Sequence, residues 1–542
     1  MIEILSENPV LLLFVVASLG YFIGTIKFKG SSLGVAAVLF TGLAFGALDP
    51  SLKIPDIVFQ LGLVLFVYSI GISSGPAFFQ SYKKNGFRDF MFIVWMLILS
   101  GIMAATISFG FDFSAATITG AYAGSTTNTP ALAGVIEYIS NNYDSATGQS
   151  MIDDAVVGYS FSYPMGVLGA IFVIIIMEKW LKIDYQKEKQ ALRKDYPVEK
   201  FLSSATVKVT NPNVFGKQLR DLFNQYNWDI VVGRVFKNDK LSLANFDTTL
   251  NENDIIMLVG SSDDLKEAIA DIGEKTASHI EYDRSEFDVR RIFVSNYFLI
   301  GKNLASLRIN EKYNALVTRI RRGDVDMLAS PDTVLEMGDR LRFVARRKDL
   351  RALSNFFGDS YSKSSKVNLF SFGLGIGLGL ILGNIEISLG PQFSFKLGYA
   401  GGPLVVGLLL GVLQRTGAVV WTLPYGANVT LRQIGLIFLL AGIGVSSGYS
   451  FVSNLSTDAI WIFLASVIIS MITAAIMLFV GYKVIKMPFS LLLGIVSNQP
   501  AILDFAQSRT GNRIPEFGYV MVFPIALIMK IVIAQILFIA LA

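Results

Sequence analysis

Apolar and charged residues separate along this chain on the scale of whole domains. Residues 8–178 and 367–541 are apolar with few charges, whereas residues 179–366 hold most of the Lys, Arg, Asp and Glu. Long apolar runs are typical of membrane-spanning helices, each of which needs about 20 residues to cross about 30 Å of hydrocarbon. The pattern therefore predicts two membrane regions with a polar region between them.

Each apolar region divides into five runs that are long enough, or nearly so, to span a membrane. In the first region we expect spanning helices near 9–26, 32–48, 57–75, 89–110 and 155–178. In the second we expect them near 367–386, 398–414, 433–449, 458–481 and 517–541. Two further stretches, 114–138 and 488–508, are broken by polar residues around an Asn-x-Pro sequence. We expect each of these to be a re-entrant hairpin.

Short peptides recur in the same order in both apolar regions. The matches are "IGISSG" (70–75) with "IGVSSG" (443–448), "GSTTNTPAL" (124–132) with "GIVSNQPAI" (494–502), and "GYSFSYP" (158–164) with "GYVMVFP" (518–524). Glycine and serine of low complexity could produce one such match. Three in order, at slowly drifting offsets of 373, 370 and 360 residues, indicate two homologous halves.

Positive charge indicates that the two halves are inverted, because Lys and Arg favour cytoplasmic loops. If the N-terminus lies outside and 114–138 re-enters, the basic run "EKWLKIDYQKEKQALRK" is cytoplasmic and the acidic "NNYDSATGQSMIDD" is outside. The second half follows the same rule if 488–508 also re-enters, and only Lys53 and Lys396 break it among the membrane-half loops. The predicted fold is an α-helical polytopic membrane protein with two inverted repeats of five spans plus one hairpin. Both termini are then outside, and residues 180–366 are cytoplasmic.

The polar region contains a second duplication, with a constant offset of 85 residues. "NVFGKQL" (213–219) matches "FLIGKNL" (298–304), and "NENDIIMLVG" (251–260) matches "EMGDRLRFVA" (336–345). Each unit is predicted to contain a strand, a Gly-Lys turn, a helix, short alternating strands and a last helix. The Gly-Lys pairs lack the GxxxxGK[ST] pattern of a phosphate loop, so we interpret them as turns. The single histidine, His279, falls in the linker between the units, where we expect it to be solvated.

Composition removes several classes of function. Of the 542 residues, 52% are hydrophobic and only 16% are charged. The chain has no cysteine, which excludes disulfides, thiol catalysis and cysteine-ligated metals. The small net charge of +4 indicates no nucleic-acid partner. No basic residue precedes the first apolar run, so we do not expect a cleaved signal peptide.

Inverted repeats whose broken elements meet at mid-membrane are the architecture of secondary transporters. Irregular backbone persists at membrane depth only where protein or a water-filled cavity satisfies it, so the hydroxyls and amides at the hairpin tips either bind a substrate or only satisfy that backbone. Helix N-termini at the tips favour an anion. The candidate residues are Ser125, Thr126, Thr127, Asn128, Thr129 and Pro130 at the first tip, and Ser497, Asn498, Gln499 and Pro500 at the second.

Two serine pairs and three charged residues are further candidates. We expect the serines to end the helices that flank the tips; they are Ser73, Ser74, Ser446 and Ser447. Lys530 falls in the middle of the last span, where it could bind a substrate carboxylate or pair with Asp504 on the second hairpin, and a purely structural pair is the alternative. Arg415, near a helix end, either binds substrate or extends to the interface. No histidine falls in the membrane regions, so a histidine proton relay is excluded.

The two 85-residue units resemble the C-terminal subdomain of regulators of potassium conductance, the TrkA-C type. The Gly-Lys-x-Leu sequence and the "ND…V" and "GD…V" turns carry the resemblance, although no G-x-G-x-x-G half precedes either unit. With two such modules between two inverted apolar halves, the whole chain resembles the bacterial aspartate:alanine exchanger family. The domains expected on this basis are membrane repeat 1 (1–185), TrkA-C-like module 1 (200–278), TrkA-C-like module 2 (285–360) and the inverted membrane repeat 2 (366–542).

The resemblance implies a secondary carrier of the bacterial inner membrane rather than an enzyme. Such a carrier exchanges a small anion (aspartate, alanine or a dicarboxylate such as succinate) by alternating access, with an elevator-like movement as our expectation. It would be a homodimer embedded in lipid, and we expect no cofactor and no metal. Whether the modules bind a regulatory ligand is left open by the resemblance.

Two other classes fit part of the pattern. A regulator-gated potassium channel would explain the modules, but it would need a TVGYG-like filter, and "ITGAYAG" (118–124) is not one. A cation/proton antiporter would be expected to place paired carboxylates at the crossing, where this chain has Asn128 and Asn498. An anion exchanger is therefore the better interpretation.

Overall fold

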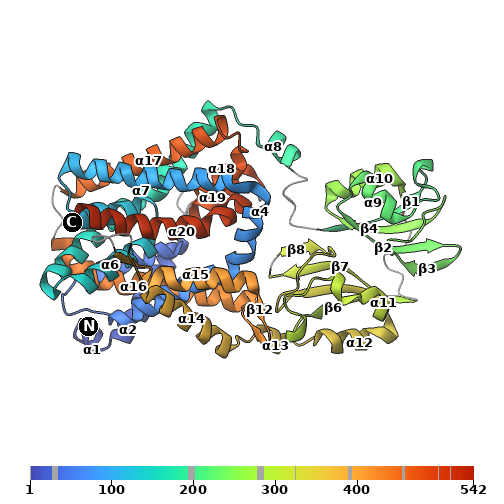
Figure 1. The fold of residues 1–542 in the computed structure, drawn as a ribbon, viewed down its shortest axis with the longest axis horizontal. Helices are drawn as coiled ribbons and strands as arrows, with labels where there is room; N and C mark the ends of the chain where they lie inside the picture. Colours follow the sequence, from blue (N-terminus) through green and yellow to red (C-terminus); the bar gives the residue numbers. More distant parts are fainter. Residues whose placement is uncertain are drawn as a thin grey trace. The chain divides into compact units, whose positions relative to one another are not determined.

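The chain folds into two compact units. We call residues 1–198, 369–412 and 428–542 the membrane unit, and residues 199–368 and 413–427 the module unit. The computed structural model describes all residues except 1, 27–33, 193–201, 278–285, 324, 389–393, 454–457, 498–499 and 513 (Figure 1). His279, which we expected to be solvated in the linker between the modules, lies outside the described residues.

The apolar runs of the sequence form helices. Seven described stretches are long and apolar enough to cross a membrane: Asp56–Pro76, Phe90–Phe111, Ser145–Trp180, Tyr361–Asn384, Tyr425–Ser446, Ala459–Lys483 and Ile514–Leu541. Three shorter apolar helices occupy the other predicted spans: α2 (Pro9–Thr25), α3 (Ala37–Gly46) and α15 (Gly398–Leu413). The predicted class, a helical membrane protein with a small α/β region in the middle of the chain, is confirmed.

Several predicted spans belong to longer helices. Helix α4 (Asp56–Phe111) has 56 residues and contains both the third and the fourth predicted span. The other long helices of the membrane unit are α7 (Ser145–Trp180), α14 (Leu369–Asn384), α16 (Tyr425–Ser453), α17 (Asp458–Lys483) and α20 (Ile514–Leu541). Short elements complete it: α1 (Ile2–Glu7), α8 (Tyr185–Leu192), β10 (Glu386–Ser388) and β11 (Ser394–Lys396).

The expectation that helices end at the two Ser-Ser-Gly sequences is wrong. Helix α4 continues beyond Gly75, and α16 continues beyond Gly448. Each sequence is the end of a Gly-x-x-x-Gly pattern, at 71–75 and at 444–448. Residues four apart lie on the same face of a helix, and two glycines there allow another helix backbone to approach closely.

Both patterns are used for such an approach. In α16, Gly444 and Gly448 face Gly42 and Gly46 of α3; a methyl group built on Gly448 would lie 2.4 Å from the carbonyl oxygen of Leu43. An added carbon has no room at that distance. The second predicted span of the first half therefore packs directly on the third predicted span of the second half.

The reciprocal pairing is also present. In α4, Gly71 and Gly75 pack against α15, whose Gly407 and Gly411 face the same stretch of α4. Between the two third spans, Gly62 of α4 meets Gly435 of α16. Gly62 and Gly435 are equivalent under the offset of 373 residues. The halves thus exchange contacts in the reciprocal way that a two-fold relation between them would produce.

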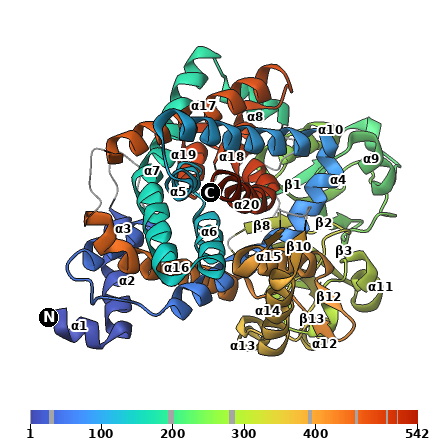
Figure 2. The same ribbon diagram turned by 60° about the vertical axis from the view of Figure 1, so that its left-hand side comes forward.

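The remaining helices of the membrane unit gather around the two hairpins. The limbs of the first hairpin, α5 (Ala115–Ser125) and α6 (Thr129–Asn142), pack on α7 and α20, and α18 (Phe489–Val496) of the second packs on α20 and α17. The second part of α4 contacts α17 and α20. Figures 1 and 2 show this hairpin group beside the glycine-packed group of α2, α3 and α14–α16.

Each module contains the elements predicted from its sequence. Module 1 has β1 (Ser203–Val209), α9 (Leu219–Tyr226), β2 (Ile230–Lys237), β3 (Lys240–Leu243), β4 (Ile255–Gly260), α10 (Ser262–Ile272) and β5 (Gly273–Lys275). Module 2 has β6 (Phe287–Phe293), α11 (Ile309–Tyr313), β7 (Ala315–Arg322), β8 (Val325–Leu328), β9 (Arg340–Arg346) and α12 (Arg347–Phe357). The antiparallel sheets run β3-β2-β4-β1-β5 and β8-β7-β9-β6, so equivalent strands hold equivalent places.

The Gly-Lys sequences are turns. Gly216 and Gly301 have φ values of +71° and +79°, in the left-handed region that glycine adopts most readily. Their backbone N–H groups donate to the carbonyl oxygens of Leu250 and Leu335. These donors are therefore engaged within the modules and are not presented to a phosphate.

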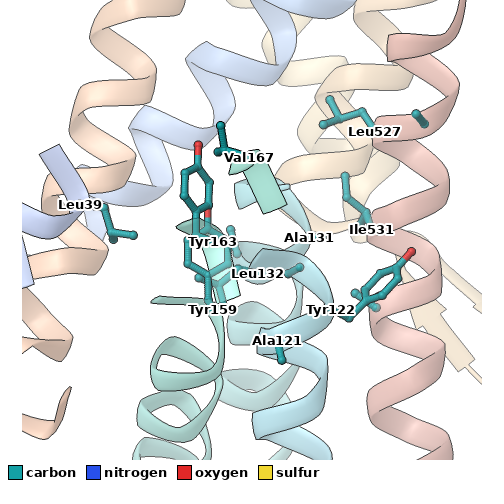
Figure 3. Close-up of a cluster of buried hydrophobic side chains, with 14 of the residues drawn as sticks. Leu39, Ala121, Tyr122, Ala131, Leu132, Tyr159, Tyr163, Val167, Leu527 and Ile531 are labelled. Carbon is teal, nitrogen blue, oxygen red and sulfur yellow. The ribbon is translucent and has the colours of Figure 1, made fainter. Parts of the chain in front are cut away.

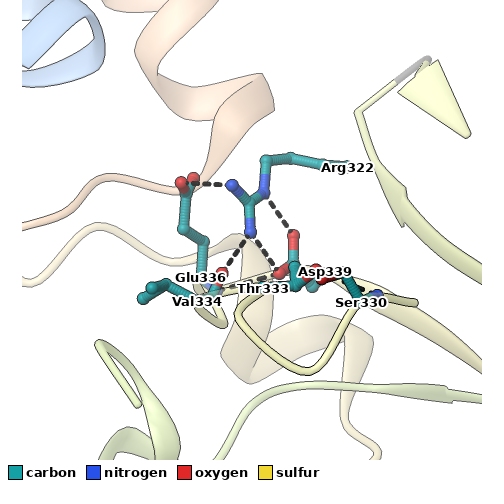
Figure 4. Close-up of polar contacts among 6 residues, drawn as sticks. All are labelled: Arg322, Ser330, Thr333, Val334, Glu336 and Asp339. Atoms are coloured by element: carbon teal, nitrogen blue, oxygen red, sulfur yellow. Dashed lines mark hydrogen bonds and ion pairs between the residues drawn. The ribbon is translucent and has the colours of Figure 1, made fainter. Parts of the chain in front are cut away.

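A cation–aspartate contact holds the turn before β4 in module 1 and the turn before β9 in module 2. In module 2, the Arg322 guanidinium donates to both carboxylate oxygens of Asp339, at 2.8 and 2.7 Å, to Glu336 and to the carbonyl oxygen of Val334 (Figure 4). Burial alone would lower the pKa of Arg322, but the hydrogen bond to Asp339 and the charges of Asp339 and Glu336 raise it overall. The aspartate of the "GD" turn is thus a structural residue.

Module 1 has the same contact 85 residues earlier, in a weaker form. The Lys237 ammonium lies 3.8 Å from Asp254 and donates to the carbonyl oxygen of Thr249 at 3.3 Å. A lysine cannot bind a carboxylate through two parallel N–H donors, as an arginine can. Asp254 and Asp339 each also accept a backbone hydrogen bond within their own turn, from Asn251 and Glu336.

We predict that Gly444→Leu destabilises the protein, whereas Gly377→Leu does not. A methyl group at Gly444 would lie 2.5 Å from the carbonyl oxygen of Leu39, but nothing lies within 4 Å of one at Gly377 in α14. Overpacking of this kind costs about 1–3 kcal/mol. The measurement is the thermal unfolding temperature of the purified full-length protein. Equal unfolding temperatures for the two variants would show that the close helix approach is not needed.

We also predict that Asp339→Ala costs more stability than Asp254→Ala. Both variants lose a hydrogen bond within a turn, but only the first leaves a largely buried arginine without its bidentate partner. Removing one member of a buried pair costs about 3–5 kcal/mol. Thermal unfolding of the two full-length variants gives the comparison, and equal losses would contradict the stronger anchor in module 2.

Candidate functional site

The first hairpin is shaped by its own sequence. The side chain of Ser114 accepts a hydrogen bond from the backbone N–H of Thr117 at 3.1 Å and so caps α5. The side chain of Asn128 does the same for α6, accepting from the N–H of Ala131 at 3.0 Å, and Pro130 occupies the first turn, where proline is tolerated. Ser114 therefore fixes where the first limb begins, and Asn128 and Pro130 fix the break between the limbs.

Protein atoms already satisfy most of the polar groups at this tip. The Thr126 hydroxyl donates to the carbonyl oxygen of Tyr122 at 2.8 Å, and that of Thr127 to the carbonyl oxygen of Thr126 at 2.9 Å. The Thr129 hydroxyl lies 2.6 Å from the Tyr159 hydroxyl. Figure 3 shows Tyr122, Tyr159 and Tyr163 among the buried apolar side chains around the hairpin. These contacts favour a backbone-supporting role for the three threonines and for Asn128.

The hydroxyl of Ser125 differs from the other groups at the tip. It is buried and has no hydrogen-bond partner among the described residues. The hydroxyl oxygen of Thr473 in α17 is also buried and also has no hydrogen-bond partner among the described residues. Unpartnered buried hydroxyls are costly, so each is a donor available to a molecule in the site.

Lys530 connects the last helix to the first tip. Its side chain is 2% exposed, and its ammonium donates to the carbonyl oxygen of Thr126 at 2.9 Å. The described residues supply no carboxylate within ion-pair distance of this ammonium. The side chain of Asp504, the expected partner of Lys530, is outside the described ones, so that pairing stays a prediction. A buried positive charge is thus held against the tip by a neutral acceptor.

A small cavity of about 40 Å³ lies at this contact. Its polar lining consists of Ser100, Ser125, Thr126, Thr127, Ser470, Thr473 and Lys530. Val496, the last residue of α18, also lines it, so the end of the second hairpin's first limb reaches the same cavity as the first tip. The volume admits a few waters but not a four-carbon dicarboxylate, so binding such a molecule requires the walls to open.

The second tip is described only in part. The Ser497 hydroxyl is 1% exposed and donates to the carbonyl oxygen of Leu493 at 2.5 Å. Asn498 and Gln499 lie outside the described residues, as do the side chains of Pro500 and Asp504. Helix α19 (Pro500–Thr510) forms the returning limb.

The described side chains of the two serine pairs do not line the cavity. The Ser73 hydroxyl is directed back to its own helix, where it donates to the carbonyl oxygens of Ser69 and Ile70 at 2.9 and 3.1 Å. Ser446 is exposed, and the side chain of Ser447 is outside the described ones. Neither Ser73, Ser74 nor Ser446 is among the residues that line the cavity.

Arg415 belongs to the module unit. It lies in β12 (Arg415–Thr416), which pairs with β13 (Val419–Val420), and its guanidinium donates to the carbonyl oxygens of Tyr297 and Gly417. Arg415 follows the end of α15 as expected, and it is not among the residues that line the cavity at the first tip, so its two expected roles stay predictions.

Sequence reasoning missed three polar residues of the cavity: Ser100, Ser470 and Thr473. Each is a single hydroxyl inside an apolar span, and a hydroxyl can bond to its own helix, so this signal is weak. The hydroxyl of Ser470 donates to the carbonyl oxygen of Met165 at 2.9 Å and so joins α17 to α7.

A cavity with a buried lysine between two helical hairpins, in an apolar helical unit connected to paired α/β modules, is an arrangement typical of transporters. A model of the aspartate:alanine exchanger family, described as a predicted permease membrane region, matches residues 12–179 and 371–539. The TrkA-C domain model matches residues 203–273 and 289–358. The chain therefore belongs to the aspartate:alanine exchanger family and carries two TrkA-C domains.

Relatives match this chain over nearly its whole length. An uncharacterized transporter of Geobacter sulfurreducens is 44% identical over 541 residues, which cover 99% of each chain. An uncharacterized transporter of Symbiobacterium thermophilum is 41% identical over 542 residues, again 99% of each chain. Among solved structures, the GsuK RCK domain covers 29% of this chain and 64% of its own, at 11% identity and a TM-score of 0.16. The family models rather than that structure therefore identify the modules.

Proposed function

We propose that this transporter exchanges small carboxylates, such as aspartate, alanine or succinate, across the bacterial inner membrane by alternating access. The observation that carries the proposal is the buried ammonium of Lys530 beside the first hairpin tip, in a cavity lined with hydroxyls. A positive charge inside a membrane protein is costly unless it has a functional partner. A carboxylate is the partner that would use both this charge and the free hydroxyls.

The residues divide into two roles under this proposal. Lys530, Ser125 and Thr473 contact the substrate, because the first is charged and the other two have no partner among the described residues. A substrate carboxylate would replace the carbonyl oxygen of Thr126 as the acceptor of the ammonium. Asn128 and Thr129 instead hold the tip in shape. Asn498 and Gln499 stay candidates for contact from the second tip.

The packing of the membrane unit supports an elevator-like movement. Glycine contacts between the halves form one group of helices, and the hairpins with α7, α17 and α20 form another. The cavity lies wholly within the second group together with the second part of α4. We assign the first group as the scaffold and the second as the carrier. The tandem modules then serve assembly or regulation rather than substrate binding.

Lys530→Gln should weaken binding of a dicarboxylate about 10- to 150-fold, since one charge-assisted hydrogen bond is worth about 1.5–3 kcal/mol. Binding of alanine, with one carboxylate and an ammonium of its own, should fall less. The measurement is counterflow in proteoliposomes with labelled succinate, aspartate and alanine. Lys53→Gln, at an exposed loop lysine, is the matched control. If Lys530→Gln and Lys53→Gln have the same apparent affinities, the site is elsewhere and Lys530 only tethers α20 to the tip.

The proposed topology predicts opposite labelling of two single cysteines in this cysteine-free chain. Lys187→Cys, at a side chain that is 85% exposed, should react with an impermeant maleimide only from the cytoplasmic side. Ser145→Cys, at the exposed start of α7, should react only from outside. The assay is maleimide labelling of intact and permeabilised cells. Labelling of position 187 from outside would overturn the inverted arrangement.

A further inference from the structure

The two hairpins differ in how their first limbs are capped. Ser114 caps α5 from the adjacent position in the chain, but α18 follows Pro488, which has no side chain able to cap it. The cap of α18 comes instead from Glu188 in α8. Its carboxylate accepts from the backbone N–H groups of Phe489 and Ser490, at 2.8 and 2.9 Å, and from the Ser490 hydroxyl at 2.7 Å.

A carboxylate is well suited to cap the N-terminus of α18. The first N–H groups of a helix have no partner within the helix, and the helix dipole favours negative charge there. Glu188 lies 301 residues before Phe489, so no local sequence rule requires this contact. Glu188 is half-buried, and its carboxylate can therefore be hydrated when it leaves the helix.

The same segment of chain also holds the other end of the hairpin. Arg509, in the last turn of α19, forms a bidentate ion pair with Glu178 near the end of α7, with its Nε at 2.9 and 3.0 Å from the two carboxylate oxygens. The Tyr185 hydroxyl donates to Glu178 at 2.9 Å. The ring of Tyr185 also packs on that of Phe489, the first residue of α18, with 6.4 Å between centroids. Residues 178–188 therefore contact both limbs of the second hairpin.

The segment that makes these contacts leads directly into the first module. Helix α8 ends at Leu192, and the first strand of module 1 begins at Ser203. Both limbs of the first hairpin are instead capped from within that hairpin, by Ser114 and Asn128. A displacement of α8 by the modules would act directly on the second hairpin, through Glu188.

We infer that residues 178–192 are a clamp through which the modules control the second hairpin, with Glu188 and Glu178 as its positioning residues. With the clamp engaged, the N-terminus of α18 is capped and the hairpin is held. When α8 moves, Glu188 leaves, the N–H groups of α18 lose their partner, and the hairpin is free to move. The inference rests on the proposed function, since it gives the modules control of a transport element.

The test of the clamp uses the full-length protein in proteoliposomes and a cysteine at the second tip, Ser497→Cys, where the wild-type side chain is buried. Loss of a helix cap shifts an opening equilibrium by roughly 2- to 30-fold. Glu188→Ala should therefore raise the maleimide labelling rate at position 497 by that factor, with Glu188→Gln in between. Lys187→Gln, one residue away and exposed, is the matched control and should change nothing.

A second cysteine shows whether the effect is confined to the second hairpin. At the first tip, Ser125→Cys should label at the same rate with and without Glu188→Ala. If Glu188→Ala and Glu188→Gln leave the rate at position 497 unchanged, or change both tips equally, there is no clamp.

Control by the modules is tested by a flexible Gly-Ser insertion after Leu192. In the otherwise wild-type chain the insertion should change labelling at position 497, and in the Glu188→Ala background it should have no further effect. An insertion without effect in both backgrounds would show that the clamp is only structural and would overturn the inference. The labelling does not depend on transport. A clamp that responds in a protein that exchanges no carboxylate would contradict the proposed function and leave the clamp supported.

Discussion

The architecture of the membrane unit depends on the close approach of helix backbones at glycine. In lipid, apolar side chains gain little by leaving one apolar surface for another, so helices associate through close packing and hydrogen bonds. Gly71 and Gly75 in α4, and Gly444 and Gly448 in α16, supply surfaces without side chains on which α15 and α3 pack. These contacts cross between the halves, so neither half can form its part of this group alone. The hairpin helices are left to pack around a different centre, where the polar atoms of the chain are buried.

That second centre combines two demands that oppose each other. Broken helices need their free backbone groups satisfied, and a transport site needs groups that are not fully satisfied. At the first tip the chain meets both demands with different residues. Asn128, Thr126 and Thr129 bond to protein atoms, whereas the hydroxyl of Ser125 has no partner among the described residues. Lys530 can both satisfy the backbone and bind a substrate, because its partner is a backbone carbonyl oxygen that a carboxylate can replace.

Much of this structure could be predicted from the sequence, because hydropathy sets the spans and the internal duplications set the module boundaries. The break at the first tip was predictable because Asn128 and Pro130 act locally. The Ser-Ser-Gly sequences were misinterpreted because serine and glycine suggest a helix end, while the spacing of Gly71 and Gly75 by one helical turn indicates packing. Contacts between distant segments were beyond reach. Lys530 meets Thr126 across 404 residues, and Glu188 caps α18 across 301, and no pattern within either segment identifies its partner.

The contact between Gly62 and Gly435 has a consequence for how such a chain can change. The two positions are equivalent in the duplicated halves and face each other, so they lie where a symmetry axis between the halves would pass. Had the halves been separate copies of one polypeptide, this residue would have met its own copy, and every substitution there would have occurred twice in the same contact. Because both halves belong to one chain, that restriction is absent here. One side can change while the other keeps its glycine, but only if the helices move apart, because a methyl group built on Gly62 would lie 2.6 Å from the carbonyl oxygen of Gly435. A substitution on one side alone would therefore let the two halves acquire different shapes at this axis.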